Sequence, residues 1–352
     1  MRVRTMSTGQ RALVTGGSGF IGRRLVEALL QRGIGVRIAT SGAPERIRWA
    51  PSYTDIVQAD LKSPESLVRA SEDCDLVFHV AYQFGGRREE QWRSNVEGTR
   101  ALAQVAVRNK VRRFVHFSSI AAYGPQPDGD LDEQAPARPN DIYAEIKHHI
   151  DQMLLEMYRA QSLPVAILQP TIVYGPRGEA WTTRLLDQVK SSRVGLPASG
   201  QGLCNAVFVD DVVSAALLAS EHEAAIGQAF LVSYATPVTW GDFYGAYAQM
   251  AREQEAVVAL DDAEFDREWR RRYGTIPALQ RYRRGLERLL AGRSPAEGGG
   301  LYLPDPGTRA LYAARTAARI DKARQRLGYA PAFDLERGMA LTAQWACDEK
   351  LI

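Results

Sequence analysis

The stretch VTGGSGFIGRRL, residues 14–25, decides the fold of this chain. It begins inside an apolar run at 11–15 and leads into residues 21–32, where apolar side chains recur at helical spacing. A second apolar run, GVRIAT at 35–40, follows the helical segment. A strand, a glycine-rich turn, a helix and a second strand within about 30 residues are typical of a βαβ unit.

The glycines of this turn have the spacing that nucleotide binding requires. Gly16, Gly19 and Gly22 permit positive φ and let the backbone approach a pyrophosphate. The helix that opens at Phe20 and Ile21 offers free N–H groups and a positive dipole. Glycines also serve tight packing, but between two strands this motif favours a dinucleotide. We therefore expect Gly16, Gly19, Phe20 and Ile21 to bind the cofactor.

Further apolar runs extend the unit into a sheet. They lie at 56–57, 76–80, 114–117 and 165–168, with helical segments between them. Strands that alternate with helices form a parallel sheet covered on both faces. The expected fold class is therefore α/β, a Rossmann-type doubly wound parallel sheet with a smaller C-terminal α+β substrate region.

The pattern also suggests domain boundaries. Residues 1–175 form the expected dinucleotide-binding domain, whose sheet is completed in part by residues 203–235, and residues 176–352 are expected mainly to bind substrate. Residues 125–139 are rich in Pro, Asp and Gly and predict an irregular loop. A basic helical insert is expected at about 256–306.

The end of the second strand bears on the choice of cofactor. NAD-binding proteins usually place a carboxylate there for the ribose 2′-hydroxyl, but this chain has Thr40. Arg23, Arg24, Arg37 and Arg46 are candidates to bind a 2′-phosphate. The pattern favours NADP over NAD, although threonine also accepts NAD. After the third strand, the pair Asp60 and Leu61 stands where a carboxylate can meet the adenine amino group, unless Asp60 only caps a turn.

Composition and charge narrow the classes of partner. Hydrophobic residues make up 45% and charged residues 24%, which is ordinary for a globular protein, and a net charge of +3 is too small to indicate nucleic acid. The three cysteines are far apart and predict neither disulfides nor zinc. The first residues contain no apolar leader, and no apolar run reaches the roughly 20 residues of a membrane helix. We expect a cytoplasmic protein with no integral membrane segment and no metal.

A tyrosine and a lysine form the candidate catalytic pair. Tyr143 and Lys147 lie four residues apart in DIYAEIKHHI, and the following apolar spacing predicts a helix that places both on one face. A phenol has a pKa near 10 and is a poor base, but a nearby ammonium favours the phenolate. An isolated YxxxK is commonly a surface pair. Ser118 and Ser119, however, follow a buried strand, at the sheet edge where ligands bind.

Motifs along most of the chain resemble one family. TGGSGFIG, ADL, VFHVAY, NVEGT, HFSSIAAYG, YAEIK, PTIVYGPR and VFVDDVV occur in this order, and the C-terminal stretch at 319–345 is also similar. The chain resembles an extended short-chain dehydrogenase/reductase of the NAD-dependent epimerase/dehydratase group. The resemblance implies NAD or NADP as cofactor, a small-molecule substrate, and a homodimer.

The resemblance also implies roles for individual residues. Tyr143 would be the general acid/base and would also contact the cofactor. Lys147 would bind the nicotinamide ribose and lower the tyrosine pKa, and Ser119 would be the catalytic serine. Asn95 would be a structural and active-site asparagine. His79, Val80 and Ala81 would line the cofactor by backbone contact. The segment from Pro170 to Tyr174 would pass under the nicotinamide.

The chain departs from the family pattern at the substrate end. Many nucleotide-sugar members have an arginine before the VDD stretch to hold the substrate diphosphate, where this chain has Cys204 and Asn205. Gln169 replaces the common arginine before Pro170, and residues 82–84 read YQF. These departures weaken a simple assignment to UDP-sugars.

Three functions therefore remain open. A nucleotide-sugar epimerase comes first, and the alternative is an NADP-dependent ketone or aldehyde reductase or a 3β-hydroxysteroid-type dehydrogenase. A non-catalytic dinucleotide-binding regulator is a third. Residues 267–293 contain nine arginines and two glutamates, and this segment is a solvated helix pair, a substitute phosphate clamp, or a partner surface.

Overall fold

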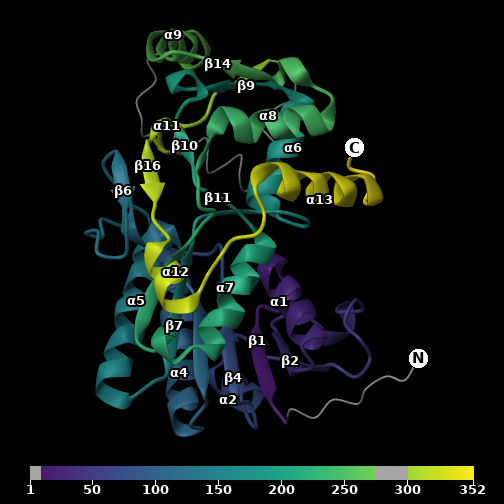
Figure 1. Ribbon diagram of the computed structural model, residues 1–352, viewed down its shortest axis with the longest axis vertical. Helices are drawn as coiled ribbons and strands as arrows, with labels where there is room; N and C mark the ends of the chain where they lie inside the picture. The colour runs from purple at the N-terminus through teal and green to yellow at the C-terminus, as the bar shows by residue number, and fades with distance from the viewer. Residues whose placement is uncertain (1–8, 275–299) are drawn as a thin grey trace.

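In the computed structural model, which describes residues 9–274 and 300–352, a seven-stranded parallel sheet forms the core of the lower lobe (Figure 1). Its strand order is β12-β7-β5-β4-β1-β2-β3, and every neighbouring pair is parallel. This topology confirms the Rossmann-type fold. The strands are β1 (Arg11–Thr15), β2 (Gly35–Thr40), β3 (Asp55–Gln58), β4 (Leu76–His79), β5 (Arg113–Phe117), β7 (Val165–Pro170) and β12 (Gln228–Val232).

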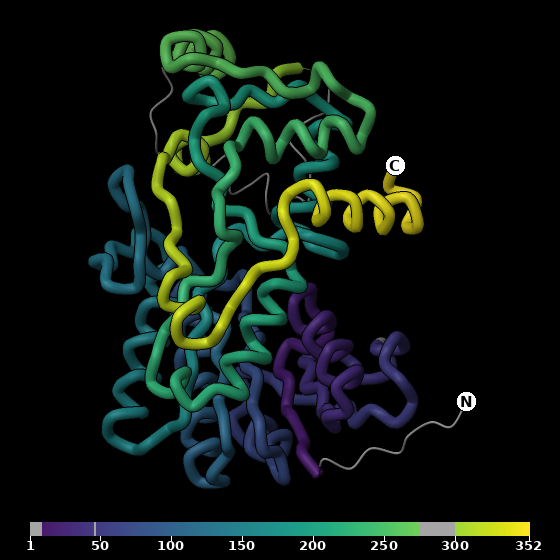
Figure 2. Tube along the Cα trace, viewed as in Figure 1, coloured from purple at the N-terminus to yellow at the C-terminus, as the bar shows by residue number. Residues whose placement is uncertain are grey.

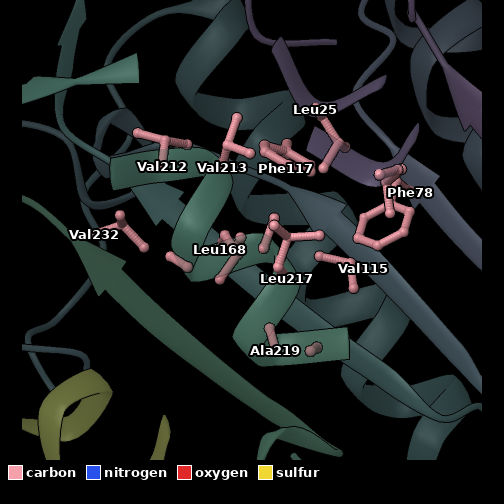
Figure 3. Packing of buried hydrophobic residues seen from close by; sticks show 14 of the residues in the cluster. Leu25, Phe78, Val115, Phe117, Leu168, Val212, Val213, Leu217, Ala219 and Val232 are labelled. Carbon is pink, nitrogen blue, oxygen red and sulfur yellow. The ribbon is translucent and has the colours of Figure 1, made fainter. Parts of the chain in front are cut away.

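Helices cover both faces of the sheet because successive strand residues enter opposite cores. Val14 belongs to one core and Leu13 to the other, and both are fully buried. Figure 3 shows the first core, where Val213 lies beside Phe117 and Leu217 lies beside Val115. The helices on this face are α1 (Phe20–Gln31), α7 (Val209–Glu221) and α12 (Asp321–Leu327), and those on the other are α2 (Pro64–Ala70), α4 (Gly98–Arg108) and α5 (Ile142–Gln161).

A second lobe is built around a small sheet and an aromatic core. β14 (Val257–Ala259) and β15 (Leu301–Tyr302) pair in parallel with β9 (Arg193–Leu196). Buried rings of Trp240, Phe243, Tyr244, Tyr247 and Tyr312 fill the space beneath it. The helices of this lobe are α6 (Arg184–Ser191), α8 (Trp240–Ala251), α9 (Asp262–Tyr273), α11 (Pro306–Ala313) and α13 (Leu335–Asp348).

Two expectations about irregular or helical regions were wrong in part. The insert expected to be helical contains β14 and β15 as well as α9, because its apolar residues complete the sheet of β9. Residues 275–299 of that insert lie outside the described part of the chain. The loop expected at 125–139 contains β6 (Gly129–Leu131), which pairs with β16 (Thr316–Ala318).

The C-terminal chain connects the two lobes. Figure 2 shows it, in yellow, leaving the upper lobe through β16, reaching the main sheet at α12 and returning upward to α13. The carboxylate of Asp211 in α7 accepts the backbone N–H groups of Ala332 (2.7 Å) and Phe333 (3.2 Å) on the return path. These contacts therefore fasten the return path of the C-terminal chain to α7 of the main sheet.

Candidate active site

The turn between β1 and α1 has no room for a side chain at Gly16 or Gly22. Gly16 has φ of +68°, and a Cβ there would lie 2.8 Å from the backbone N of Ala81. A Cβ on Gly22 would collide with the carbonyl oxygen of Gly16, to which Gly19 donates its N–H at 3.0 Å. The glycines therefore bring β1, α1 and the end of β4 into direct backbone contact, and the N-terminus of α1 stays exposed.

A cavity of about 450 Å³ adjoins this turn. It reaches from the N-terminus of α1 to the end of β2, and it includes Gly19, Phe20 and Thr40 among the residues expected to bind cofactor. Free N–H groups and a helix dipole at one end suit an anionic pyrophosphate. The remaining lining residues are Ser18, Arg23, Ser41, Gly42, Ala43, Ile47, Trp49 and Arg177.

The four candidate arginines lie in different surroundings. Arg23 lines the cavity, its guanidinium 4.6 Å from the centre of the Trp49 ring, and it pairs with Glu27 at 3.0 Å. Arg37 instead donates to Asp55 and to two backbone carbonyls beside α2. The interpretation of Arg37 as a phosphate ligand was therefore wrong, because its guanidinium is already satisfied at the other end of β2.

Arg24 is also engaged in the fold. It donates two hydrogen bonds of 2.8 Å to Asp210 of α7, and the strong pairing raises its pKa. It joins two helices of the same face, so the expectation that it meets a 2′-phosphate was wrong as well. The side chain of Arg46 lies outside the described part of the structure.

The other expected cofactor residues lie at the strand ends but do not line this cavity. Asp60 accepts the N–H of Lys62 at 2.9 Å, and Leu61 is buried next to it. Val80 and Ala81 donate their N–H groups to the carbonyl and the hydroxyl of Thr15. Pro170 ends β7 beside Val232. The contacts of these residues with a nucleotide stay predictions.

The helix α5 carries the catalytic pair. Asp141 caps its N-terminus by accepting the N–H of Ala144 at 2.8 Å, which places Tyr143 in the first turn and Lys147 one turn later. Lys147 is 3% exposed and donates from Nζ to the carbonyl oxygen of Phe117 at 2.6 Å. Its ammonium lies 5.8 Å from the centre of the Tyr143 ring.

Burial acts in opposite directions on the two ionisable groups of this pair. It raises the pKa of Tyr143, while a hydrogen bond from Ser119 lowers that pKa. It lowers the pKa of Lys147, while the negative charge of Asp151 raises it. Ser119 follows β5 and its Oγ also accepts the N–H of Ala121 at 3.1 Å. The structure thus brings the three predicted catalytic residues Ser119, Tyr143 and Lys147 together at the carboxyl end of β5.

A buried polar network lies behind this pair and was missed from the sequence. Asp151 accepts hydrogen bonds from Ser118 Oγ (2.8 Å) and Gln169 Nε2 (2.9 Å). Gln169 Oε1 accepts in turn from the hydroxyl of Tyr123 at 2.8 Å. The signal was available in part, because Asp151 continues the spacing of four residues from Tyr143 and Lys147 on α5.

His79 and Asn95 have structural roles. His79 joins the hydroxyls of Thr15 and Thr99 at 2.8 Å each, and burial lowers its pKa to about 3, so the ring is neutral. Asn95 binds the backbone of Gln83 from both sides, with contacts of 2.8 and 3.0 Å. Among the described residues no group of three or more His, Cys, Asp or Glu side chains is placed to hold a metal.

An aromatic wall, the ring surface of Tyr82 and Phe84, covers one side of Tyr143. The rings of Phe84 and Tyr143 are stacked at 5.9 Å and 18°, and that of Tyr82 meets Tyr143 edge-on at 5.0 Å. Phe84 is 69% exposed. Sequence analysis noted residues 82–84 only as a departure from the family pattern, since nothing local predicts that this loop folds over α5.

The family of this chain follows from comparison with known proteins. A family model described as the NAD dependent epimerase/dehydratase family matches residues 12–233, and the chain belongs to this family. A "UDP-glucose 4-epimerase" of Mycolicibacterium smegmatis is 32% identical over 278 residues, 72% of this chain and 85% of that protein. A "3-beta-hydroxysteroid dehydrogenase" of Mycolicibacterium neoaurum is 28% identical over 250 residues, 66% and 68% of the two chains.

A third relative and a solved structure extend these findings. A "4-hydroxy-2-methyl-3-oxo-4-farnesyl-3,4-dihydroquinoline-1-oxide ketoreductase" of Stigmatella aurantiaca is 28% identical over 240 residues, 66% of this chain and 71% of that protein. A UDP-glucose 4-epimerase of Thermotoga maritima, solved with UDP-glucose, has the same fold, with a TM-score of 0.73 at 20% identity over 97% and 100% of the chains. The chain is accordingly an NAD(P)-dependent enzyme of the short-chain dehydrogenase/reductase type.

The described helices contain none that combines the length and the apolar character needed to cross a bilayer.

Proposed function

We propose that this chain is an NADP(H)-dependent dehydrogenase or reductase acting at a secondary alcohol or ketone carbon of a largely apolar substrate. The observation that carries the proposal is the placement of Tyr143 between Ser119 and the aromatic wall of Tyr82 and Phe84. The nucleotide-sugar epimerase, placed first from the sequence, becomes the second candidate.

The residues of the site fit a dinucleotide and a proton transfer. Ser18, Gly19 and the cavity beside them would hold the cofactor, and the open N-terminus of α1 with its closely packed turn supports this. When bound, the nicotinamide supplies or accepts the hydride. In reduction Tyr143 donates its hydroxyl proton to the substrate oxygen, and in oxidation its phenolate accepts that proton. Ser119 holds the substrate oxygen by a hydrogen bond, and the charge of Lys147 favours the phenolate.

The position of the family's diphosphate ligand argues against a nucleotide sugar. Cys204 is fully buried. Asn205 donates from Nδ2 to the carbonyl of Thr316 at 2.9 Å and accepts the N–H of Ala318 at 2.9 Å. Both halves of the amide are thus used to hold β16, and neither side chain is a cation that could bind a diphosphate.

The aromatic wall supports an apolar substrate. Phe84 presents a large apolar ring to solvent next to Tyr143, where burying ring surface against a substrate is favourable. Two relatives named for acting on a steroid and on a farnesylated ring system are consistent with this class of substrate. The epimerase relative at 32% identity is the observation that keeps the second candidate.

The cavity supports NADP over NAD. Arg23 faces it near Thr40, Ser41 and Gly42, at the end of β2 where the adenosine ribose would lie. No carboxylate is found among the described residues that line the cavity, but Arg23 is paired with Glu27 at 3.0 Å. A 2′-phosphate would therefore share the guanidinium of Arg23 with that carboxylate.

The test is to mix the purified protein with NADPH and either a bicyclic apolar ketone or UDP-glucose. We expect NADPH to be oxidised in step with ketone reduction, and no conversion of UDP-glucose to UDP-galactose. Interconversion of the UDP-sugars with tightly held NAD and no net consumption of NADPH would instead establish the epimerase.

The wall is tested by Phe84→Ala, which we expect to lower kcat/KM for the bicyclic ketone about tenfold, the loss of about 1.4 kcal/mol of binding. A small aliphatic ketone should be affected much less. Leu341→Ala removes an apolar side chain that is 45% exposed on α13 and serves as the matched control. Equal losses for both ketones would remove the argument for the apolar substrate.

A further inference from the structure

Asp151 is a buried carboxylate whose hydrogen-bond donors carry no charge. It lies on α5 one turn after Lys147 and two turns after Tyr143. Its side chain is 4% exposed, and its two hydrogen-bond donors, Ser118 and Gln169, are both neutral. One carboxylate oxygen, Oδ1, has no hydrogen-bond partner in the structure. Such a group costs free energy unless a charge compensates it.

The groups around Asp151 come from β4, β5, β7, the short turn Ile120–Tyr123 and α5 itself. His116 of β5 places Nε2 3.9 Å from Asp151 Oδ1, but burial and the charge of Lys147 hold the pKa of His116 well below its ordinary value. His79 of β4, whose ring is 5.4 Å from that of His116, is neutral for the same reason. The hydroxyl of Tyr123 reaches the network through Gln169 of β7. Lys147 is the cation whose charge acts on Asp151.

Lys147 needs Asp151 in the same way. Among the described residues its ammonium has one hydrogen-bond acceptor, the carbonyl of Phe117, and lies 4.9 Å from the centre of the Tyr82 ring. Burial favours the uncharged amine. The charge of Asp151 opposes this effect. Burial raises the pKa of Asp151 to about 7, and the charge of Lys147 opposes that rise. The charge of each member of the pair therefore favours the ionised form of the other, against the effect of burial.

We propose that Asp151 is a positioning residue that keeps Lys147 charged under Tyr143 and holds, through Ser118, the turn that carries Ser119. The proposal rests on the catalytic roles proposed above for Tyr143 and Lys147. Its consequence is that the basicity of Tyr143 is set by a residue two turns away that touches neither substrate nor cofactor.

The direction of one pH shift distinguishes this role from a simpler one. Asp151 also acts on Tyr143 directly, because a negative charge disfavours the phenolate. If this direct effect were the only one, Asp151→Asn would lower the pKa of Tyr143. If Asp151 acts through Lys147, loss of the carboxylate removes the ammonium and makes Tyr143 harder to ionise.

The first experiment is the pH profile of alcohol oxidation for the wild type, Asp151→Asn and Asp151→Glu. We expect the pH at half-maximal kcat to rise by about one unit or more in Asp151→Asn, and to return toward the wild-type value in Asp151→Glu. An unchanged or lower midpoint in Asp151→Asn would overturn the proposal. If that variant does not fold, Ser118→Ala gives the test, since removing a donor to the carboxylate should shift the midpoint in the same direction by less.

The second experiment uses the protein without cofactor or substrate. The wild type, Asp151→Asn, Lys147→Met and the double variant form a cycle in which the free energy of unfolding is measured at about pH 8. We expect the double variant to lose less stability than the sum of the losses in the two single variants. The reason is that each single variant leaves one charge buried without its partner. Additive effects would overturn the pairing, even if the proposed oxidoreductase activity holds. Absence of that activity would leave this cycle unaffected.

Discussion

The two ends of the site are built in different ways. The proposed cofactor end is shaped by backbone, where Gly16 and Gly22 leave no space for a Cβ and let β1, α1 and the end of β4 come together. The proton-transfer end is made of side chains on one face of α5, where Tyr143, Lys147 and Asp151 are spaced by four residues. The first end depends on shape and the second on charge, so substitutions should affect them through different measurable quantities.

The largest effect is expected at the proton-transfer end. Tyr143→Phe removes the group that moves the substrate proton and should lower kcat by about 10²–10⁴-fold. Cofactor affinity, measured by quenching of protein fluorescence, should change little, since the phenol is at the other end of the site. A variant that kept full turnover would refute the mechanism proposed for this chain.

At the cofactor end, Gly16→Ala should abolish measurable cofactor binding and lower the Tm by several degrees. The substitution forces a Cβ at φ of +68° within 2.8 Å of the Ala81 nitrogen, and such strain costs about 1–3 kcal/mol. Gly245→Ala is the matched control, because it lies inside α8 with open space around it and should leave the Tm equal or higher. Equal Tm values for both variants would contradict the argument from the turn.

His79 lies between the two ends, binding Thr15 of β1 and facing His116 of the buried network. Its pKa is lowered from 6.5 to about 3 in the folded protein, so an unfolded chain takes up a proton that the folded one does not. The free energy of unfolding is therefore highest above the ordinary histidine pKa of 6.5 and falls as the pH falls below it. Between about pH 7 and pH 5 the expected loss from His79 is about 2 kcal/mol.

The measurement is urea unfolding of the wild type and His79→Gln at both pH values. The variant should be less stable at neutral pH because two buried hydroxyls lose a partner, and it should depend less on pH. The same pH dependence in both proteins would show that His79 takes up its proton in the folded state.

A smaller effect is expected for the choice of cofactor. Arg23→Ala should weaken the binding of NADPH by about tenfold, because an arginine–phosphate contact is lost. The affinity for NADH should change little. Arg24→Ala removes the double contact with Asp210 and should lower the Tm without altering the ratio of the two affinities. A parallel loss of both cofactors in Arg23→Ala would indicate that Arg23 binds the pyrophosphate instead.

The same contrast explains what the sequence could predict. The β1–α1–β2 unit was placed to within one residue, because strand runs, glycines and helical periodicity are all local signals. The pair Tyr143 and Lys147 is likewise readable from one helix. β14 and β15 were missed because strands of two or three residues carry no period and depend on β9 for their pairing.

What could not be predicted depends on segments that are distant along the chain. Asp151 and Gln169 meet across α5 and β7, and Arg177 reaches the cofactor cavity from beyond β8 (Ile172–Tyr174). The misplaced roles of Arg24 and Arg37 have the same origin, since their carboxylate partners belong to other elements. The domain boundaries, the homodimer and the cytoplasmic location remain predictions.

Asn205 limits how this chain could evolve. Its side-chain amide forms two hydrogen bonds with the backbone of β16, as a neighbouring strand would. An arginine at 205 would add a phosphate ligand, but it would also remove these two hydrogen bonds. A route toward nucleotide sugars would first need another way to hold residues 316–318. The order in which substitutions arise, and not only their identity, therefore restricts the activities that this sequence can reach.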